Sequence, residues 1–225
     1  MSDLKDRWEG ASPEKIKKWY YQKIGENVKD ALRKNFFDAY YFEKREDAIK
    51  FILDKIKPEA SVGMGGSVTL RELNLDELIK QKVSKVYDHW PETLSAEEKK
   101  RIRKAQLLCD IFLTSSNAIT MNGELVNIDG IGNRVGALNF GPGEVIVVAG
   151  INKVVNDRDA AIYRIKNVVA PMNAKRLGYD VPCAKLGRCV DCDTQQRICR
   201  SLLILERSPR ASNITVVLIG EELGF

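Results

Sequence analysis

The sequence contains a single histidine, His89, and no apolar run of the length that crosses a membrane. One histidine excludes a metal site built on three histidines. A membrane helix takes about 18 or more consecutive apolar residues, so we expect no membrane span. The first ten residues, MSDLKDRWEG, also lack the apolar core of a signal peptide, which favours a cytoplasmic protein.

Motifs for binding nucleic acid are missing as well. Lys and Arg outnumber Asp and Glu by 36 to 31, but the basic residues alternate with acidic ones along predicted helices, as in EKREDAIK and EEKKRIRK. This pattern is typical of solvated helix faces with some attraction for small anions. We therefore expect no nucleic-acid partner and keep a small anionic ligand as a candidate partner.

Hydrophobic residues make up 44% of the 225 residues, which is enough for one large α/β domain with its own core. A helix is expected within residues 1–35, because Ser12-Pro13-Glu14 is a helix start and apolar residues then recur at helical spacing. Beyond it, β-prone and amphipathic segments alternate. The expected strands are 36–42, 60–62, 82–87, 111–113, 125–128 and 145–149, and the expected helices are 45–56, 68–73, 75–81, 95–108 and 157–177, the last bent at Pro171.

This alternation predicts a single domain over residues 1–225 with three layers, a largely parallel central sheet and helices on both of its faces. Residues 201–206 and 214–219 are β-prone, and we expect them to close that sheet as a terminal strand pair. A short cysteine-rich segment, 183–199, is expected just before them at the sheet edge. The apolar stripe of the N-terminal helix leaves oligomerisation open.

Polar side chains gather in the stretch from Asp110 to Gly150. An Asn122-Gly123 turn predicts a hairpin, and a glycine-rich polar turn with Asp129, Asn133 and Arg134 follows it. Small-molecule sites of α/β sheets lie beyond the carboxyl ends of the strands, so we expect a site here. Arg134 can bind a carboxylate or phosphate in a bidentate manner. The alternative is a solvent-exposed turn stabilised by Asp and Asn.

A second candidate ligand loop comprises Gly63, Gly65, Gly66 and Ser67, between an expected strand and an expected helix. Backbone N–H groups that converge at a helix start can hold an anion. The loop lacks the Gly-Lys-Ser/Thr of a P-loop and the third glycine of a dinucleotide-binding motif, and no other NAD or flavin motif is found. The alternative is a tight turn that requires glycine.

Four of the five cysteines follow the spacing Cys183-x5-Cys189-x2-Cys192-x6-Cys199. Four thiolates can ligate one zinc ion or one iron–sulfur cluster, and the sequence does not decide between these metals. Basic neighbours such as Lys185 and Arg197 are expected to favour the thiolate form. The alternatives are unliganded thiols or a redox-active Cys189/Cys192 pair. The fifth cysteine, Cys109, is expected in the core.

The histidine lies in Asp88-His-Trp-Pro91, just past an expected strand. Its intrinsic pKa suits a general base, but a lone histidine in a loop also occurs without any catalytic role. Both interpretations remain open.

The motifs SNAITMNGELVNIDGIGNRVGAL, VVAGINKVV and PMNAKRLG, together with the Gly63 loop and the cysteine segment, resemble the LUD-domain family from about Ser12 onward. The resemblance implies a fold similar to ribose-5-phosphate isomerase and the coenzyme A transferases. It also implies a role in lactate utilization, as a component of or accessory to an iron–sulfur system that oxidises L-lactate to pyruvate, with an iron–sulfur partner subunit. Electron transfer through the cysteines fits this role better than hydride transfer, because no flavin or nicotinamide motif is present.

Two other functions remain open. The first is an enzyme or binding protein for a small phosphorylated or carboxylated substrate or a coenzyme A ester. Its ligand-binding residues are expected to be Gly63, Gly65, Gly66, Ser67, Asn117, Asn133 and Arg134, with Asp129 or Glu124 as catalytic acid or base. The second is a structural zinc domain that binds a protein partner and needs only the four cysteines.

Overall fold

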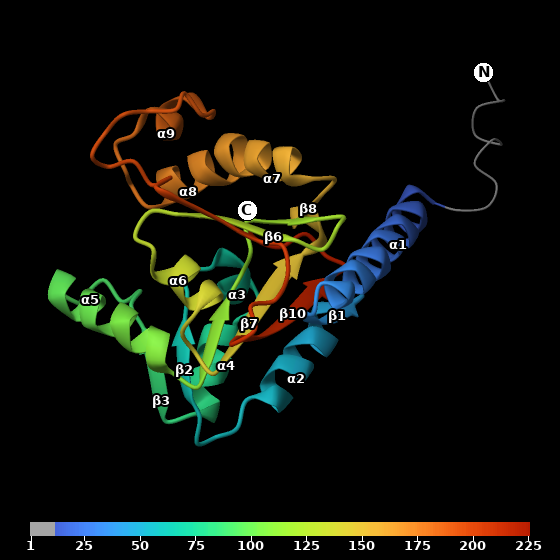
Figure 1. Cartoon of the computed structure of the whole chain (residues 1–225), viewed down its shortest axis with the longest axis horizontal. Helices are drawn as coiled ribbons and strands as arrows, with labels where there is room; N and C mark the ends of the chain where they lie inside the picture. The colour runs from blue at the N-terminus through green and yellow to red at the C-terminus, as the bar shows by residue number, and fades with distance from the viewer. Residues whose placement is uncertain (1–11) are drawn as a thin grey trace.

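The computed structural model describes residues 12–225 and contains a six-stranded sheet in which all neighbouring strands are parallel (Figure 1). In sheet order the strands are β1 (Asp38–Phe42), β10 (Asn213–Ile219), β7 (Glu144–Gly150), β4 (Ile111–Thr114), β2 (Ser61–Met64) and β3 (Lys85–Asp88). Helices pack on both faces, so the predicted α/β fold is confirmed. The expected absence of a signal peptide concerns residues 1–10, which lie outside the described residues.

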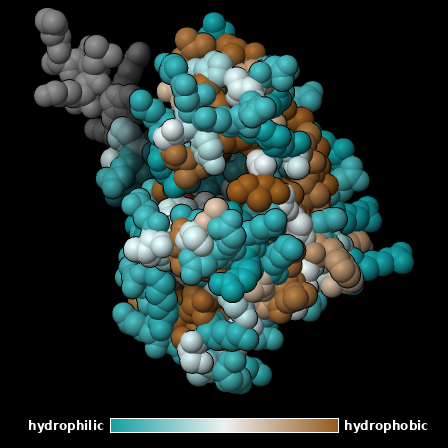
Figure 2. All heavy atoms as spheres, turned by 90° about the vertical axis from the view of Figure 1, so that its left-hand side faces the viewer, coloured by the Kyte–Doolittle hydropathy of each residue, from teal (hydrophilic) through white to brown (hydrophobic). Residues whose placement is uncertain are grey.

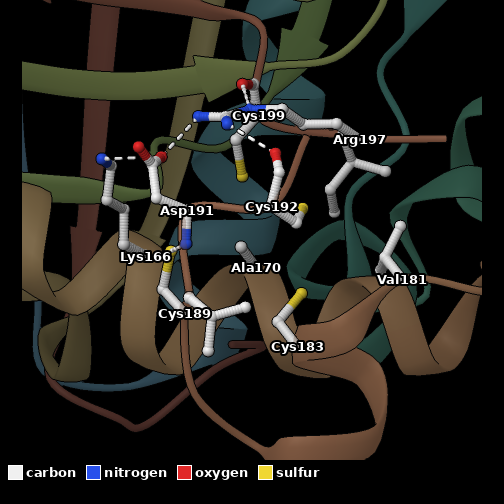
Figure 3. Close-up of a pocket in the computed structure, with 11 residues that line it drawn as sticks. Lys166, Ala170, Val181, Cys183, Cys189, Asp191, Cys192, Arg197 and Cys199 are labelled. Atoms are coloured by element: carbon white, nitrogen blue, oxygen red, sulfur yellow. Dashed lines mark hydrogen bonds and ion pairs between the residues drawn. The ribbon is translucent and has the colours of Figure 1, made fainter. Parts of the chain in front are cut away.

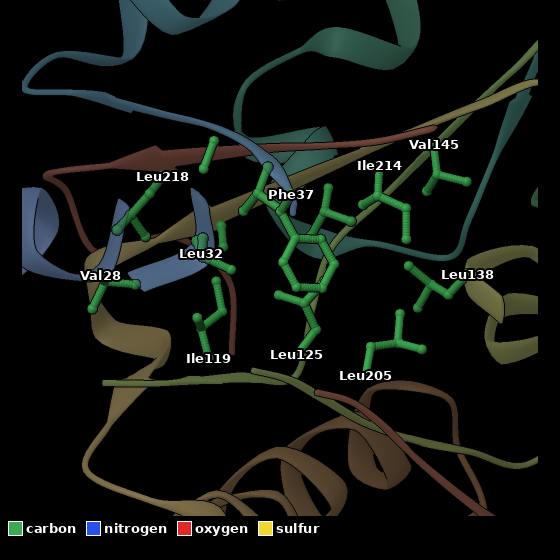
Figure 4. Close-up of a cluster of buried hydrophobic side chains, with 14 of the residues drawn as sticks. Val28, Leu32, Phe37, Ile119, Leu125, Leu138, Val145, Leu205, Ile214 and Leu218 are labelled. Carbon is green, nitrogen blue, oxygen red and sulfur yellow. The ribbon is translucent and has the colours of Figure 1, made fainter. Parts of the chain in front are cut away.

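Strand β7 is apolar at almost every position because both of its faces are covered. Val145, Val147 and Ala149 belong to one core, and Ile146 and Val148 belong to the other. Successive side chains of a strand point to opposite faces, so a strand buried on both sides needs apolar residues throughout. The first core, part of which is drawn in Figure 4, packs against α1 (Pro13–Lys34) and α6 (Asn133–Asn139), and the second packs against α2 (Arg45–Lys55), α3 (Val68–Glu72) and α4 (Leu75–Lys82).

A second sheet of four strands lies against the first core, and the sequence did not predict it. In sheet order its strands are β8 (Val154–Val155), β5 (Ala118–Thr120), β6 (Leu125–Asp129) and β9 (Ser201–Leu205). Strands β5 and β6 form the hairpin expected at Asn122-Gly123. The expected terminal strand pair is wrong, because β9 joins β6 in this sheet and β10 inserts between β1 and β7 in the other.

Helices α7 (Arg158–Arg164) and α8 (Ala170–Arg176) cover the outer face of the second sheet. Asp157 caps the first of them by accepting a hydrogen bond from the N–H of Ala160 at 2.8 Å. A π-helical segment, η4 (Ile165–Val169), joins the two helices directly before Pro171. Proline cannot donate the backbone hydrogen bond of a regular helix, so the irregularity expected at this position is present.

The remaining helices frame the ends of the fold. Helix α1 starts as expected, with Ser12 accepting a hydrogen bond from the N–H of Lys15 and Pro13 in the first turn. Helix α5 (Ala96–Ala105) and the short η2 (Gln106–Leu108) connect β3 to β4, and α9 (Pro182–Leu186) begins the cysteine-rich segment. None of the helices within residues 12–225 is both long enough and apolar enough to span a bilayer.

Candidate functional site

Three neighbouring strands of the central sheet, β2, β4 and β7, lead at their carboxyl ends into one polar cluster. Thr69 lies in α3 after β2, Ser115 directly follows β4, and Lys153 ends the short η3 helix (Ile151–Lys153) after β7. The amine of Lys153 donates hydrogen bonds to Thr69 Oγ1 at 2.7 Å and to Ser115 Oγ at 2.8 Å. The cluster thus lies where α/β sheets hold their ligands.

Lys153 is buried without a carboxylate partner. Lys153 is 4% exposed, and no acidic group in residues 12–225 lies within ion-pair distance of its amine. Burial, together with the positive charges of Arg164 and Arg134, lowers the pKa of Lys153 to about 7. The amine is therefore partly unprotonated near neutral pH. Its surroundings contain two hydroxyl groups and more positive than negative charge.

Arg134 lies beside this cluster, in a helix rather than in the expected polar turn. Asn133 and Arg134 begin α6, so the alternative of a solvent-exposed turn does not apply to them. The guanidinium is mostly buried and donates to the Ile128 carbonyl at 2.8 Å, to Asn117 Oδ1 at 3.0 Å and to the Ser115 carbonyl at 3.2 Å. It joins the hairpin to the end of β4, so most of its donors are used inside the protein.

Asp129 and Asn117 also make internal bonds. The Asp129 carboxylate accepts the N–H groups of Ile131 and Gly132, each at 2.9 Å, and lies 3.8 Å from Arg134 Nε. Burial opposes ionisation, yet the guanidinium and the backbone N–H groups hold the pKa of Asp129 below its usual range. Asn117 Oδ1 accepts the N–H of Ile128 at 2.9 Å. Both residues fix the loop geometry around the cluster.

Glu124, the other predicted acid or base, has different partners. It follows the hairpin turn, where Thr120 Oγ1 donates to it at 3.0 Å and Arg158 of α7 pairs with it. The hydrogen bond from Arg158 lowers the pKa of Glu124 despite burial. A carboxylate held in this way is ionised at neutral pH and ties the second sheet to α7.

The glycine loop is explained in large part by packing. Gly63 lies inside β2, where an added Cβ would stand 3.0 Å from Cys109 Sγ. The Gly65 N–H donates to the Leu113 carbonyl at 2.8 Å, and Ser67 caps α3 by accepting the N–H of Leu70. A Cβ on Gly66 would stand 2.9 Å from Trp90 Nε1. A ligand-binding role for Gly63, Gly65, Gly66 and Ser67, as for Asn117, Asn133 and Arg134, stays a prediction.

Trp90, which follows β3, contacts both α3, which packs on the central sheet, and α8, which lies over the second sheet. The guanidinium of Arg71, from α3, lies 4.0 Å from the centre of its ring, and that of Arg176, from α8, lies 4.8 Å from it. Stacked guanidinium groups are attracted to an indole ring on either face. Figure 2 views the molecule from the side on which Figure 1 labels α5, α8 and α9, and it shows a hollow between the upper and lower parts of that face.

The four cysteines of the C-terminal segment line one pocket, which Figure 3 shows. Cys183 comes from α9, whereas Cys189, Cys192 and Cys199 come from the loop that follows it. Apolar side chains of Ala170, Val181, Val190 and Ile198 complete the wall, with Lys166, Asp191 and Arg197 at its polar side. The segment from residue 183 to residue 199 therefore places four cysteines around one pocket.

Arg197 holds this loop in shape. Its guanidinium donates to the Cys192 carbonyl at 2.7 Å, to the Cys199 carbonyl at 2.8 Å and to Asp191 Oδ1 at 2.8 Å. The Asp191 N–H in turn donates to Cys189 Sγ at 3.3 Å. Arg197 or its ion-pair partner Asp191 thus makes a hydrogen bond to each of three cysteines, Cys189, Cys192 and Cys199.

The expectation that basic neighbours favour thiolates is wrong for two of the cysteines. Burial and the adjacent thiols raise the pKa of Cys199 to about 11 and also raise that of Cys183. Lys185 pairs with Asp180 at 2.6 Å, and Arg197 pairs with Asp191, so part of the positive charge is directed elsewhere. Over residues 12–225, no three His, Cys, Asp or Glu side chains are arranged as a metal-binding group.

The chain matches the family model described as the LUD domain over residues 25–219. The chain belongs to the LUD-domain family. That family is associated with lactate utilization in general. The resemblance that the sequence motifs indicated is thereby confirmed.

A solved structure supports the fold of this LUD-domain protein. The crystal structure of a DUF162 family protein from Deinococcus radiodurans is similar with a TM-score of 0.50 and 14% sequence identity, covering 88% of this chain and 98% of that chain. At this identity the similarity shows the fold alone. No curated protein matches the sequence.

The cysteine pocket and the polar cluster of the LUD domain share a boundary. The N–H of Arg200 donates to the Asp129 carbonyl at 3.0 Å, and a Cβ on Gly130 would stand 2.8 Å from the Ile198 carbonyl. The cysteine segment thus packs directly on the loop that positions Arg134. Sequence patterns do not predict this contact, because it joins segments about 70 residues apart.

His89 is part of an internal hydrogen-bond group in this LUD-domain protein. Gln106 Nε2 lies 3.0 Å from His89 Nδ1 and donates to the carbonyls of Met64 and Tyr87, each at 2.9 Å. Burial, followed by the charge of Arg103, lowers the pKa of His89 to about 4. The imidazole is neutral at physiological pH and holds the end of β3 in place.

Sequence reasoning missed Lys153 and Arg164 as candidate functional residues. A lysine three residues beyond a strand and an arginine within an amphipathic helix are usually solvated, so the positions of Lys153 and Arg164 do not by themselves predict a functional role. The available signal was the position of Lys153, which follows a central strand just as Ser115 and Ser67 do. It also lies inside the motif VVAGINKVV that carries the family resemblance.

Proposed function

We propose that this LUD-domain protein acts in lactate utilization as an electron-carrying component of an iron–sulfur system that oxidises L-lactate to pyruvate. The observation that carries the proposal is the convergence of Cys183, Cys189, Cys192 and Cys199 on one pocket. Oxidation of L-lactate to pyruvate releases two electrons and two protons. The chain has no nicotinamide or flavin motif, so we place the oxidation itself with a partner subunit and electron transfer with this chain.

The four thiols of the pocket are of the kind that an iron–sulfur cluster takes, and a cluster would require them to lie closer together than in the structure, where no three within residues 12–225 form a metal-binding group. An N–H bonded to a ligating sulfur is one way in which proteins set a cluster potential, and the Asp191 N–H, which donates to Cys189 Sγ, would act in this way if Cys189 were a ligand. Ala170 and Val181 limit solvent on one side. A bound cluster would supply one-electron acceptance and donation. The chain's own contribution is to hold the four sulfurs through α9 and the Arg197-braced loop.

The position of the pocket also supports the proposal. Three of its cysteines are intermediate in exposure, so a redox partner can approach closely. Lys166, Arg197 and Arg200 lie at or beside the pocket and outnumber Asp191, which pairs with the first two, so the rim keeps a net positive charge. An acidic surface of a partner subunit is the natural complement of such a rim.

The test is the iron and acid-labile sulfide content of the whole protein, purified without oxygen, together with its visible and electron paramagnetic resonance spectra. We expect iron, sulfide and a visible band in the native protein, and their loss in Cys189→Ser. The matched control is Cys109→Ser, because Cys109 is buried in the core away from the pocket, bonded to the carbonyls of Gln106 and Ile111.

A second step connects the cluster to lactate. Lactate should bleach the visible band only in the presence of the partner subunits. Zinc without sulfide would overturn the electron-transfer proposal and support the structural zinc domain. A loaded cluster that lactate and its oxidising partner cannot reduce would overturn the lactate assignment while leaving the metal centre intact.

A further inference from the structure

Lys153 has a donor to spare. In its protonated form the amine carries three protons, and residues 12–225 provide acceptors for two of them, Thr69 Oγ1 and Ser115 Oγ. Both acceptors are hydroxyl groups, which carry no charge. A buried ammonium group is costly unless a negative charge or a full set of acceptors compensates it.

Arg164 provides a second incompletely matched cation next to the first. Its Nε donates to the carbonyl of Asn152, the residue before Lys153, at 3.2 Å, and its Nη1 donates to the Asn117 carbonyl at 2.9 Å. Both acceptors are neutral, and no acceptor within the described residues is recorded for Nη2. Burial lowers the pKa of Arg164, with no acidic group opposing the shift.

Acidic groups near the cluster do not balance these charges. Asp129 lies against Arg134, the third cation of the cluster. Glu72 is the carboxylate that acts on Lys153, yet it is exposed and accepts the N–H of Gly224. Lys153 and Arg164 therefore share an environment with positive charge in excess.

We propose that Lys153 and Arg164 bind a small oxyanion, a carboxylate or a phosphate, at the junction between the two sheets. Charge-assisted hydrogen bonds from the ammonium and the guanidinium hold the oxygens. The hydroxyl groups of Ser115 and Thr69 donate to the carbonyls of Ser116 and Leu223 at 3.4 Å each, and they can rotate to donate to the anion instead. The site comes from segments that follow β2, β4 and β7, plus one side chain from α7.

This site does not depend on the cysteine pocket or on lactate oxidation. It places the small anion at residues that keep part of their donors unused, whereas a site at the glycine loop and Arg134 stays a separate prediction. Arg134 contributes its charge, while its hydrogen bonds keep Ser115 and Asn117 in position.

The experiment measures binding of inorganic phosphate, L-lactate and pyruvate to the whole protein by isothermal titration calorimetry, in a buffer free of other oxyanions. Phosphate alone binding identifies a phosphate site, and L-lactate or pyruvate alone binding identifies a carboxylate site. Lys153→Met keeps the length of the side chain and removes its charge. We expect its affinity to fall by about tenfold or more, as loss of a hydrogen bond to a charged group implies.

The matched control is Lys175→Met, which removes the same charge from an exposed position of α8. Its affinity should equal that of the native protein. Arg164→Gln should weaken binding as Lys153→Met does, and circular dichroism establishes that both variants are folded. The proposal is overturned if none of the three anions binds the native protein, or if Lys153→Met and Arg164→Gln bind them as the native protein does.

Discussion

Arg158 holds one carboxylate oxygen of Glu124 with two nitrogens, Nε at 2.9 Å and Nη2 at 2.5 Å. The glutamate belongs to the hairpin of the second sheet and the arginine is the first residue of α7, so the pair joins two layers. Its Glu124 side chain is 9% exposed, whereas Glu206, the other partner of Arg158, is 63% exposed. Glu124 and Glu206 therefore offer a comparison of a buried and an exposed carboxylate that pair with the same arginine, Arg158.

Glu124→Gln should lower the free energy of unfolding by about 1 to 3 kcal/mol, because a charge-assisted bond is replaced at a buried position. Glu206→Gln should change it by less than about 0.5 kcal/mol, since exposed ion pairs contribute little. Urea unfolding at pH 7 measures both. Equal losses in the two variants would show that burial of Glu124 is not what makes the pair stabilising.

The same pair predicts a pH dependence. The folded pKa of Glu124 is lower than its unfolded value, so its contribution is complete above the unfolded pKa and is lost as pH falls through the folded one. The difference in stability between native protein and Glu124→Gln should therefore shrink on acidification. Unfolding curves at pH 7 and in the acidic range below the unfolded carboxyl pKa test this sign.

Phe36 directly follows Asn35, the C-cap residue of α1; it adopts the left-handed region, with a φ of 64°, and is 70% exposed. The N–H groups of Phe36 and Phe37 donate to the carbonyls of Arg33 and Leu32, which is the pattern of a helix end that favours glycine. Phe36→Gly should raise stability by about 0.5 to 1 kcal/mol, because a left-handed side chain is strained. An unchanged or lower melting temperature would contradict this.

Gly123 and Gly187 provide a matched pair for the cost of a close approach. Both have positive φ, 76° and 71°. A Cβ on Gly123 would stand 2.5 Å from the backbone of Ala31 and Leu32, whereas a Cβ on Gly187 would meet nothing within 4 Å. Alanine at Gly187 should cost about 1 to 2 kcal/mol from backbone strain. At Gly123 the loss should be larger by about 1 to 3 kcal/mol, because helix α1 must move away from the hairpin.

Lys153→Met should be at least as stable as the native protein at pH 7 in the absence of an anion, since it removes an uncompensated buried charge. The folded pKa of Lys153 is about 7, below its unfolded value near 10.5, so the stability linked to it is complete above about pH 10.5 and lost as pH falls through 7. The variant should lack this decline between mildly alkaline and neutral pH. A native protein and variant with parallel pH profiles would contradict a buried, unpaired amine.

Much of the central sheet could be predicted because each strand carries its own signal. The run Val145 to Ala149 is apolar on both faces, and Asn122-Gly123 marks a turn that few other pairs form so well. The second sheet was not predictable in this way. Strand β8 has two residues, and the pairing of Ser201–Leu205 with β6 rather than with its sequence neighbour is decided by contacts across the whole chain.

The candidate site was predicted in its location more than in its residues. The carboxyl ends of the strands were expected to hold a ligand, and a polar cluster is found there. Arg134 and Asp129 stood out because charged residues between glycines are conspicuous in a sequence. Whether their hydrogen bonds are already satisfied by Asn117, Ile128 and Ile131 depends on the folded backbone, and the sequence does not contain that information directly.

Two of the connections between the sheets are only three residues long, Ser115–Asn117 between β4 and β5 and Ile151–Lys153 between β7 and β8. The hydrogen bond from Lys153 to Ser115 links one connector to the other. A sliding or twisting motion of one sheet over the other would move these short connectors together with the longer ones, which run through α6 and through residues 206–212. An anion held between Lys153 and Arg164 would restrict the motion of the two sheets relative to each other. Amide hydrogen exchange in both sheets would then slow together when the anion binds.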